Sequence, residues 1–149
     1  MLRLSALLLC LLAAACGNRA EEAAPAVTRA AGPAAINGMI DRYAAVYDVP
    51  APLIHRVVQR ESGYNPAARN GPYYGLMQIN PVTARTMGHS GPPEALLDAE
   101  TNLKYAVKYL RGAWMVSDGS YDRAVSWYSR GYYYEAKRRG LLKETGLRR

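Results

Sequence analysis

The chain has 149 residues, a length that favours one domain around a single core. Nineteen Lys and Arg residues oppose twelve Asp and Glu residues, so the net charge is +7 and a polyanionic partner is physically reasonable. Two histidines and two cysteines are too few to build a zinc site or a Cys/His nucleophile pair readily, so we expect neither.

Residues 1–16 have the pattern of an export signal. Arg3 supplies a positive charge, and residues 7–12 form an apolar run that is too short to span a membrane. Cys16 follows three alanines and matches the acylated cysteine of bacterial lipoproteins, although Ala13 stands where such sites usually carry Leu. Two interpretations stay open: lipidation of Cys16 with anchoring to the outer membrane, or ordinary cleavage after an Ala-x-Ala pattern. Both predict export to the periplasm.

Residues 17–34 are rich in alanine and contain two prolines, and they offer little to bury, so we expect a flexible tether. The folded domain is then predicted over residues 35–149. Its first helix, closed by residues 48–52, is indicated by apolar residues at helical spacing: Ile36, Met39, Ile40, Tyr43, Val46 and Tyr47.

A second helix is predicted from an apolar stripe formed by Leu53, Ile54, Val57 and Val58, and it ends at a glycine. The stripe continues by one turn onto Glu61, which would place this carboxylate against the core. Burial favours the protonated form, and a protonated Glu can donate to a leaving-group oxygen near neutrality, as acid cleavage of a glycosidic bond requires. An exposed Glu at a fraying helix end is the alternative that the pattern alone leaves open.

The rest of the chain predicts further helices and no β alternation. Residues 67–80 are expected to be loop or short extended structure, and Asn80 with Pro81 indicates a capped helix to about residue 87. A long helix is predicted from about residue 101, and a last one over 121–129 after a turn at 118–119. The basic C-terminal end is interpreted as a solvated tail in preference to a nucleic-acid site. The predicted fold class is therefore mainly α.

Several motifs fall in an order that resembles the catalytic domain of lytic transglycosylases related to goose-type lysozyme. They are IHRVVQRESG at 54–63, NPAA at 65–68 and GLMQINPVTA at 75–84. Asp98, Asn102, Tyr109 and Leu110 resemble the family's D-x-x-x-N-x-x-x-G-x-x-Y-L helix, and residues 127–131 resemble its A-Y-N-x-G motif. The resemblance spans about residues 50–131 and implies a single lysozyme-like helical domain with a substrate cleft.

The resemblance also implies roles for individual residues. Glu61 would be the single acid/base and Ser62 the neighbouring hydroxyl that orients the substrate or the carboxylate. Met77 and Gln78 would contact sugar rings, and Tyr128 would place its hydroxyl near Glu61. The implied partner is the glycan strand of peptidoglycan, cut between N-acetylmuramic acid and N-acetylglucosamine to leave 1,6-anhydromuramyl ends, without a cofactor. We expect a monomer and no nucleic-acid partner.

Three departures from the family pattern are Ala106, Trp127 and Ser129, and the last two flank Tyr128. Two alternatives stay open. A muramidase of the same fold would deliver water with help from a second carboxylate, for which the sequence offers Asp98, Glu100, Asp118 and Asp122. A non-catalytic module that binds cell wall or nucleic acid would use the twelve tyrosines and the basic end.

Overall fold

The computed structural model describes residues 32–148, and the predicted mainly α class is confirmed. The predicted export signal, Cys16 and nearly all of the tether lie outside the described residues. Within 32–148, no helix combines the length and the apolar character needed to cross a membrane.

The first two helices are α1 (Pro33–Tyr47) and α2 (Ala51–Ser62). In α1, Ile36, Ile40 and Tyr43 are buried as predicted, but Val46 is 61% exposed. At 3.6 residues per turn, Val46 lies roughly 90° around the helix axis from the centre of that stripe, which explains the wrong prediction. In α2 the whole predicted stripe is buried, and Gly63 ends the helix with φ +58°.

A small two-stranded antiparallel sheet follows, formed by β1 (Arg69–Asn70) and β2 (Tyr73–Tyr74), as expected for short extended structure. Helix α3 (Pro81–Thr86) is capped as predicted, because the side chain of Asn80 accepts a hydrogen bond from the main-chain N–H of Val82 at 2.8 Å. The 3-10 helix η1 (Pro93–Leu97) had no counterpart in the prediction. It is too short to produce a recognisable apolar period.

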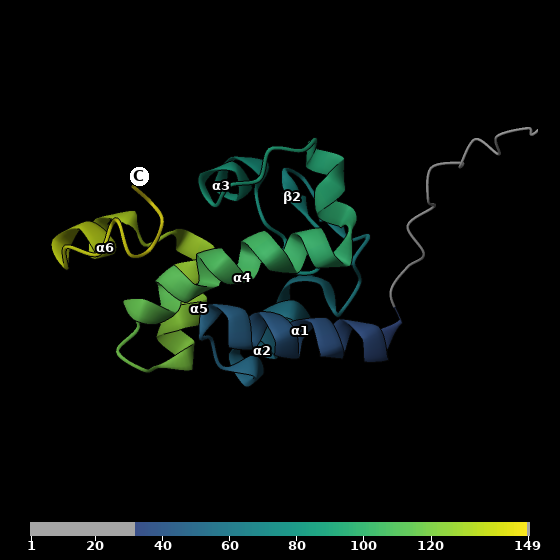
Figure 1. Ribbon diagram of the computed structural model, residues 1–149, viewed down its shortest axis with the longest axis horizontal. Helices are drawn as coiled ribbons and strands as arrows, with labels where there is room; N and C mark the ends of the chain where they lie inside the picture. Colours follow the sequence, from purple (N-terminus) through teal and green to yellow (C-terminus); the bar gives the residue numbers. More distant parts are fainter. Residues whose placement is uncertain (1–31, 149) are drawn as a thin grey trace, which may run out of the picture.

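Helix α4 (Ala99–Met115) crosses the middle of the molecule, with α1 and α2 on one side and β2 and α3 on the other (Figure 1). It begins two residues before its predicted start, because Asp98 accepts a hydrogen bond from the main-chain N–H of Thr101 and caps it. Its buried face contacts α1, α5 and η1 and supplies much of the core: Leu103, Ala106, Val107, Leu110 and Ala113.

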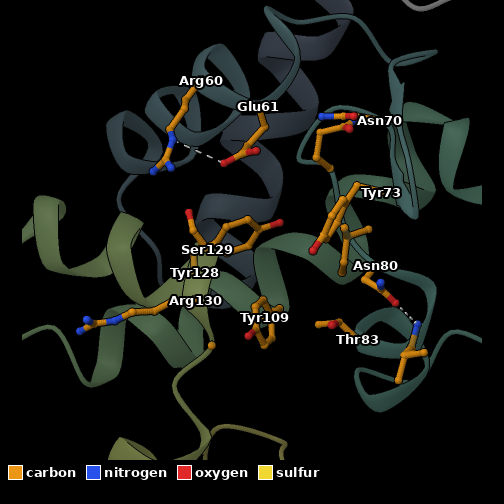
Figure 2. Close-up of a pocket in the computed structure, with 14 residues that line it drawn as sticks. Arg60, Glu61, Asn70, Tyr73, Asn80, Thr83, Tyr109, Tyr128, Ser129 and Arg130 are labelled. Carbon is orange, nitrogen blue, oxygen red and sulfur yellow. Dashed lines mark hydrogen bonds and ion pairs between the residues drawn. The ribbon is translucent and has the colours of Figure 1, made fainter.

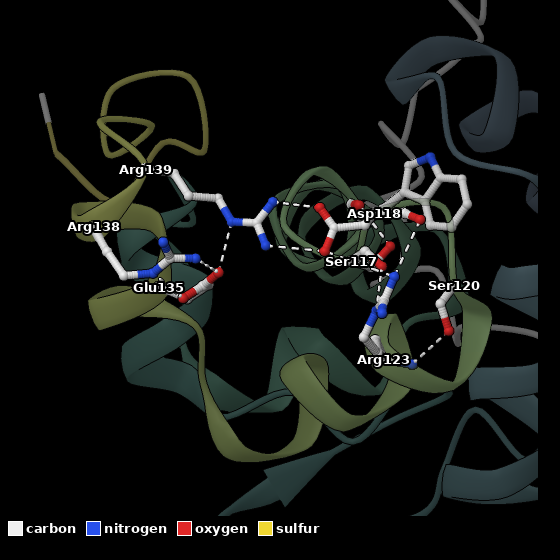
Figure 3. A network of polar contacts seen from close by, with 8 residues as sticks. Ser117, Asp118, Ser120, Arg123, Glu135, Arg138 and Arg139 are labelled. Atoms are coloured by element: carbon white, nitrogen blue, oxygen red, sulfur yellow. Dashed lines mark hydrogen bonds and ion pairs between the residues drawn. The ribbon is translucent and has the colours of Figure 1, made fainter.

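Helix α5 (Tyr121–Arg130) is confirmed, with Ser120 as its cap, and α6 (Tyr133–Arg138) follows. Most basic side chains of the C-terminal end are exposed, as a solvated basic end predicts, but the segment itself packs against the domain. Tyr132 is buried against α4 at Gly112, where its hydroxyl donates to the main-chain oxygen of Tyr109 at 2.9 Å. Arg139 joins Asp118 at 2.6 Å and Glu135 at 2.6 Å, and so ties α6 to the turn after α4 (Figure 3).

Candidate active site

An open pocket of about 680 Å³ lies where the end of α2, the small sheet, α3, α4 and the end of α5 meet (Figure 2). It is lined mainly by polar and aromatic side chains. The lining residues are Arg60, Glu61, Asn70, Tyr73, Gln78, Ile79, Asn80, Val82, Thr83, Tyr109, Tyr128, Ser129, Arg130 and Gly131. Three residues that the sequence predicted to act together, Glu61, Gln78 and Tyr128, therefore share one pocket.

Glu61 stands in the last turn of α2, one turn beyond the fully buried Val57 and Val58. Its side chain is 23% exposed, at the border between the core and the pocket. Partial burial raises the pKa of the Glu61 carboxyl, and the guanidinium of Arg60, 3.7 Å away, opposes that effect. The site therefore holds a carboxyl group that keeps its proton to higher pH than an exposed Glu.

Gln78 forms part of the pocket wall in an unusual backbone conformation, with φ +46°. Its amide nitrogen donates to the main-chain oxygens of Ala68 at 3.0 Å and Gly75 at 2.9 Å. Its amide oxygen is buried and has no hydrogen-bond partner among the described residues. Because buried acceptors are usually satisfied, this oxygen lacks a partner that a turn of the side chain toward the pocket would allow it to find.

The loop that carries Gln78 is fixed by Asn102, a fully buried residue of α4. The amide oxygen of Asn102 accepts from the main-chain N–H of Met77 at 2.9 Å, and its amide nitrogen donates to the main-chain oxygens of Tyr74 and Leu96, both at 2.8 Å. A Cβ at Gly75 would lie 2.3 Å from the amide nitrogen of Asn102. Sequence analysis identified Asn102 only as part of a motif. Its positioning role becomes visible only in three dimensions.

Tyr128 closes the pocket wall opposite Glu61 (Figure 2). Its hydroxyl donates to the main-chain oxygen of Met77 at 2.8 Å, and its ring packs edge-on against Tyr109 at 5.5 Å between centroids. Burial, reinforced by the charge of Glu61, raises the pKa of Tyr128 well above its ordinary value. The hydroxyl therefore remains protonated, and because its hydrogen is engaged, it can offer only an acceptor to the pocket.

The structure does not bring the side chains of Ser62 and Met77 to the pocket lining. The hydroxyl of Ser62 donates to the main-chain oxygen of Leu76 at 2.7 Å and so ties α2 to the loop. The side chain of Met77 is fully buried in the core. Both residues hold the wall of the pocket, and the contacts with substrate that the resemblance implied for them stay predictions.

The four other carboxylates considered from the sequence lie elsewhere. Asp98 caps α4, Glu100 pairs with Arg42 and accepts from Tyr43, Asp118 pairs with Arg139, and Asp122 pairs with Arg56. Among the residues that line the pocket, Glu61 alone carries a carboxylate.

Other parts of the lining had no clear sequence signal. The pocket-lining residues for which no role was predicted come from five different elements: Arg60, Asn70, Tyr73, Thr83 and Arg130. Residues 32–148 contain no group of three or more His, Cys, Asp or Glu side chains arranged to hold a metal ion.

Comparisons with known proteins identify the family of the chain. The family model for the transglycosylase SLT domain matches residues 38–141. The soluble lytic murein transglycosylases of Escherichia coli K12 and of E. coli O157:H7 are each 33% identical to the chain over 87 residues. That match covers 53% of this chain and 13% of each relative, so the chain corresponds to a small part of those proteins. No solved structure gave a significant match. Since the family match covers most of the chain, including all of the pocket lining, the protein belongs to the transglycosylase SLT domain family.

Proposed function

We propose that this domain is a peptidoglycan lytic transglycosylase with Glu61 as its single acid/base. The observation that carries the proposal is the setting of Glu61, a partly buried carboxyl group in a pocket shared with Gln78 and Tyr128. Burial raises the pKa of this carboxyl, so it keeps a proton that it can give to a glycosidic oxygen. The family match and the names of the E. coli relatives support peptidoglycan as the substrate.

The pocket offers the kinds of contact that a sugar chain needs. The ring of Tyr73 is 46% exposed at one side of the pocket and can stack on the apolar face of a sugar. The amide oxygen of Gln78, which is buried and unpaired, would accept the N–H of an acetamido group once the side chain turns it toward the pocket. Together these contacts would orient an N-acetylated sugar beside Glu61.

In the proposed reaction, Glu61 protonates the oxygen that links N-acetylmuramic acid to N-acetylglucosamine, and that bond breaks. The N-acetyl oxygen of the muramyl residue stabilises the positive charge that develops at C1. The Glu61 carboxylate then takes the proton from the C6 hydroxyl as its oxygen bonds to C1. The product is a 1,6-anhydromuramyl end, formed without water, and Glu61 returns to its protonated state.

A reaction with one carboxylate fits the composition of the pocket. Glycosidases that use two carboxylates place them about 5 to 9.5 Å apart on either side of the bond. Here Asp98, Glu100, Asp118 and Asp122 lie outside the pocket lining, and each is engaged in a cap or an ion pair. This arrangement favours the transglycosylase over a muramidase that depends on a second carboxylate.

The substitution Glu61→Gln tests the proposal. It preserves shape but removes the transferable proton, so release of muropeptides from purified peptidoglycan should fall by about 10²- to 10⁴-fold or more. The matched control is Glu94→Gln at an exposed Glu in η1, which should leave the rate unchanged. Full turnover by the Glu61 variant would refute the assignment.

Mass spectrometry of the wild-type products identifies the reaction, because a 1,6-anhydro end is lighter by one water than a reducing end. Reducing ends would replace the proposal with the muramidase alternative.

We also propose that residues 1–16 direct export to the periplasm. The mass of the mature N-terminus separates an acylated Cys16 from ordinary cleavage.

A further inference from the structure

The pocket has one cationic side and one neutral side. Arg60 at the end of α2 and Arg130 at the end of α5 both line it. Figure 2 shows both side chains on the same side of Glu61, with that of Arg130 extending outward at the edge of the pocket, whereas the opposite side holds uncharged residues: Asn70, Tyr73, Asn80 and Thr83. A sugar chain in this pocket would therefore have positive charge on only one of its sides.

Arg130 is held in place without being neutralised. Its guanidinium lies 3.9 Å from the ring centroid of Trp127, a half-buried residue one turn earlier on α5. A cation over an aromatic ring is attracted to it but keeps its full charge and most of its hydrogen-bond donors. Among the described ion pairs, none joins Arg130 to a carboxylate, whereas Arg60 lies 3.7 Å from Glu61. Arg130 is thus the cation of this side that is free to bind an external anion.

Resting on the proposed glycan-cleaving function, we propose that Arg130, supported by Trp127, binds a carboxylate carried by a muramyl residue of the strand. N-acetylmuramic acid differs from N-acetylglucosamine by a lactyl group, which either bears a peptide with free carboxylates or is itself a carboxylate where the peptide is missing. A planar guanidinium donates two parallel hydrogen bonds to such a group. The cationic side would therefore distinguish muramyl residues from glucosaminyl residues and set the direction in which the strand lies.

The charge distribution of the pocket lining supports this inference. Two arginines and one glutamate line the pocket, and Glu61 must be protonated to act as an acid, so the reacting pocket carries an excess of positive charge. An anion near Arg60 would also compete with Glu61 for that guanidinium. Loss of this competing interaction would favour the protonated form of Glu61, the form that the proposed reaction needs.

Binding to a catalytically disabled protein tests the inference apart from turnover. In the Glu61→Gln background, calorimetry would measure Kd for three ligands: peptide-bearing glycan strands, strands stripped of peptide by an amidase, and chitotetraose, which has no carboxylate. Adding Arg130→Gln should weaken binding of the carboxylate-bearing strands by about three- to tenfold and leave chitotetraose within about twofold. Arg85→Gln is the matched control, because it removes the same charge from an exposed position on α3 outside the pocket lining.

The three ligands also separate the sources of the carboxylate. A loss confined to peptide-bearing strands assigns it to the peptide, and a loss confined to stripped strands assigns it to the lactyl group. Trp127→Leu keeps the charge of Arg130 but removes its support, so it should give a smaller loss of affinity for the same ligands.

The inference is overturned if Arg130→Gln weakens the binding of chitotetraose equally, leaves the binding of every ligand unchanged, or has the same effect as Arg85→Gln. If no ligand binds and the wild type releases no muropeptides, the proposed function fails with it.

Discussion

The loop at residues 74–78 and the C-terminal segment at residues 131–148 are both attached to α4, but by different interactions. The loop is held by the buried amide of Asn102 through three hydrogen bonds, with no room for a side chain at Gly75. The C-terminal segment is held by a single buried hydrogen bond, from Tyr132 to the main chain of α4, and otherwise by partly exposed ion pairs of Arg139. Buried hydrogen bonds are costly to leave unmade, whereas exposed ion pairs are screened by water and salt. Only the first kind of attachment fixes a wall of the pocket.

The largest effect is expected from Asn102→Ala. The substitution leaves the main-chain N–H of Met77 and the main-chain oxygen of Leu96 without the partner they have now, in a fully buried place. The free energy of unfolding should fall by about 3 to 5 kcal/mol, measured by urea denaturation. Asn80→Ala removes a partly exposed helix cap and should cost about 1 kcal/mol. Equal losses for the two variants would contradict the contrast between buried and exposed attachment.

Gly75→Ala should have the next largest effect. Gly75 has φ +71°, and a new Cβ would lie 2.3 Å from both the amide nitrogen of Asn102 and the main-chain oxygen of Leu96. Strain and crowding together should lower the free energy of unfolding by about 2 to 4 kcal/mol. Gly71→Ala offers a control with a similar backbone, φ +55°, and open space around the Cβ, so it should cost only about 1 to 2 kcal/mol. The difference between the two variants measures the tight fit at the loop.

The helices of this domain were predictable because their signals are local. The stripe in α2, the Asn80 cap and the Ser120 cap each depend on residues within a few positions of one another. The same logic placed Glu61 against the core, as the continuation of an apolar stripe, but its role as acid/base came only from the family resemblance. Val46 shows the limit, since it continues the pattern of α1 but lies too far around the helix to be buried.

The parts that sequence analysis missed depend on contacts between distant segments. Asn102 meets the loop across 25 residues of sequence, and Tyr132 meets the main chain of Tyr109 across 23. Neither contact leaves a periodic pattern. The packing of the C-terminal segment was missed because composition records the charges of Arg138 and Arg139 but not their partners. The cationic side of the pocket was missed because its two arginines come from α2 and α5, which are distant in the sequence.

A smaller effect is expected from Arg139→Gln, which removes the bridge between Asp118 and Glu135. Stability should fall by less than for Asn80→Ala, and the loss should largely disappear in about 0.5 M NaCl, because these side chains are partly exposed. Lys137→Gln, which removes one charge from an exposed position on α6, controls for net charge. A loss that is insensitive to salt would show that the segment is held by something other than these ion pairs.

The same ion pairs predict how stability depends on acid. Hydrogen bonds and charges from Arg138 and Arg139 lower the pKa of Glu135 to about 2, from an ordinary value of 4.5. A pKa that is lower in the folded state gives stability above the unfolded value, and this stability is lost as the pH falls from about 4.5 toward 2. Glu135→Gln should flatten the stability profile in that window, as followed by thermal unfolding. An unchanged profile would mean that the pairs persist in the unfolded chain or do not form.

The smallest effect concerns Arg60, whose contact with the partly buried Glu61 is a partly exposed ion pair at the pocket. The positive charge favours the carboxylate and so opposes the rise in the pKa of Glu61 that burial causes. In Arg60→Gln that opposition is gone, and the pKa of Glu61 should rise. The proposed acid is active only when protonated, so the alkaline limb of the kcat/KM profile should move to higher pH, with the rate below that limb changed by less than about fivefold. Arg85→Gln should leave the limb in place. A shift to lower pH would show that the alkaline limb reports the titration of a group other than Glu61. The effect of Arg60 on the profile would then say nothing about the catalytic acid.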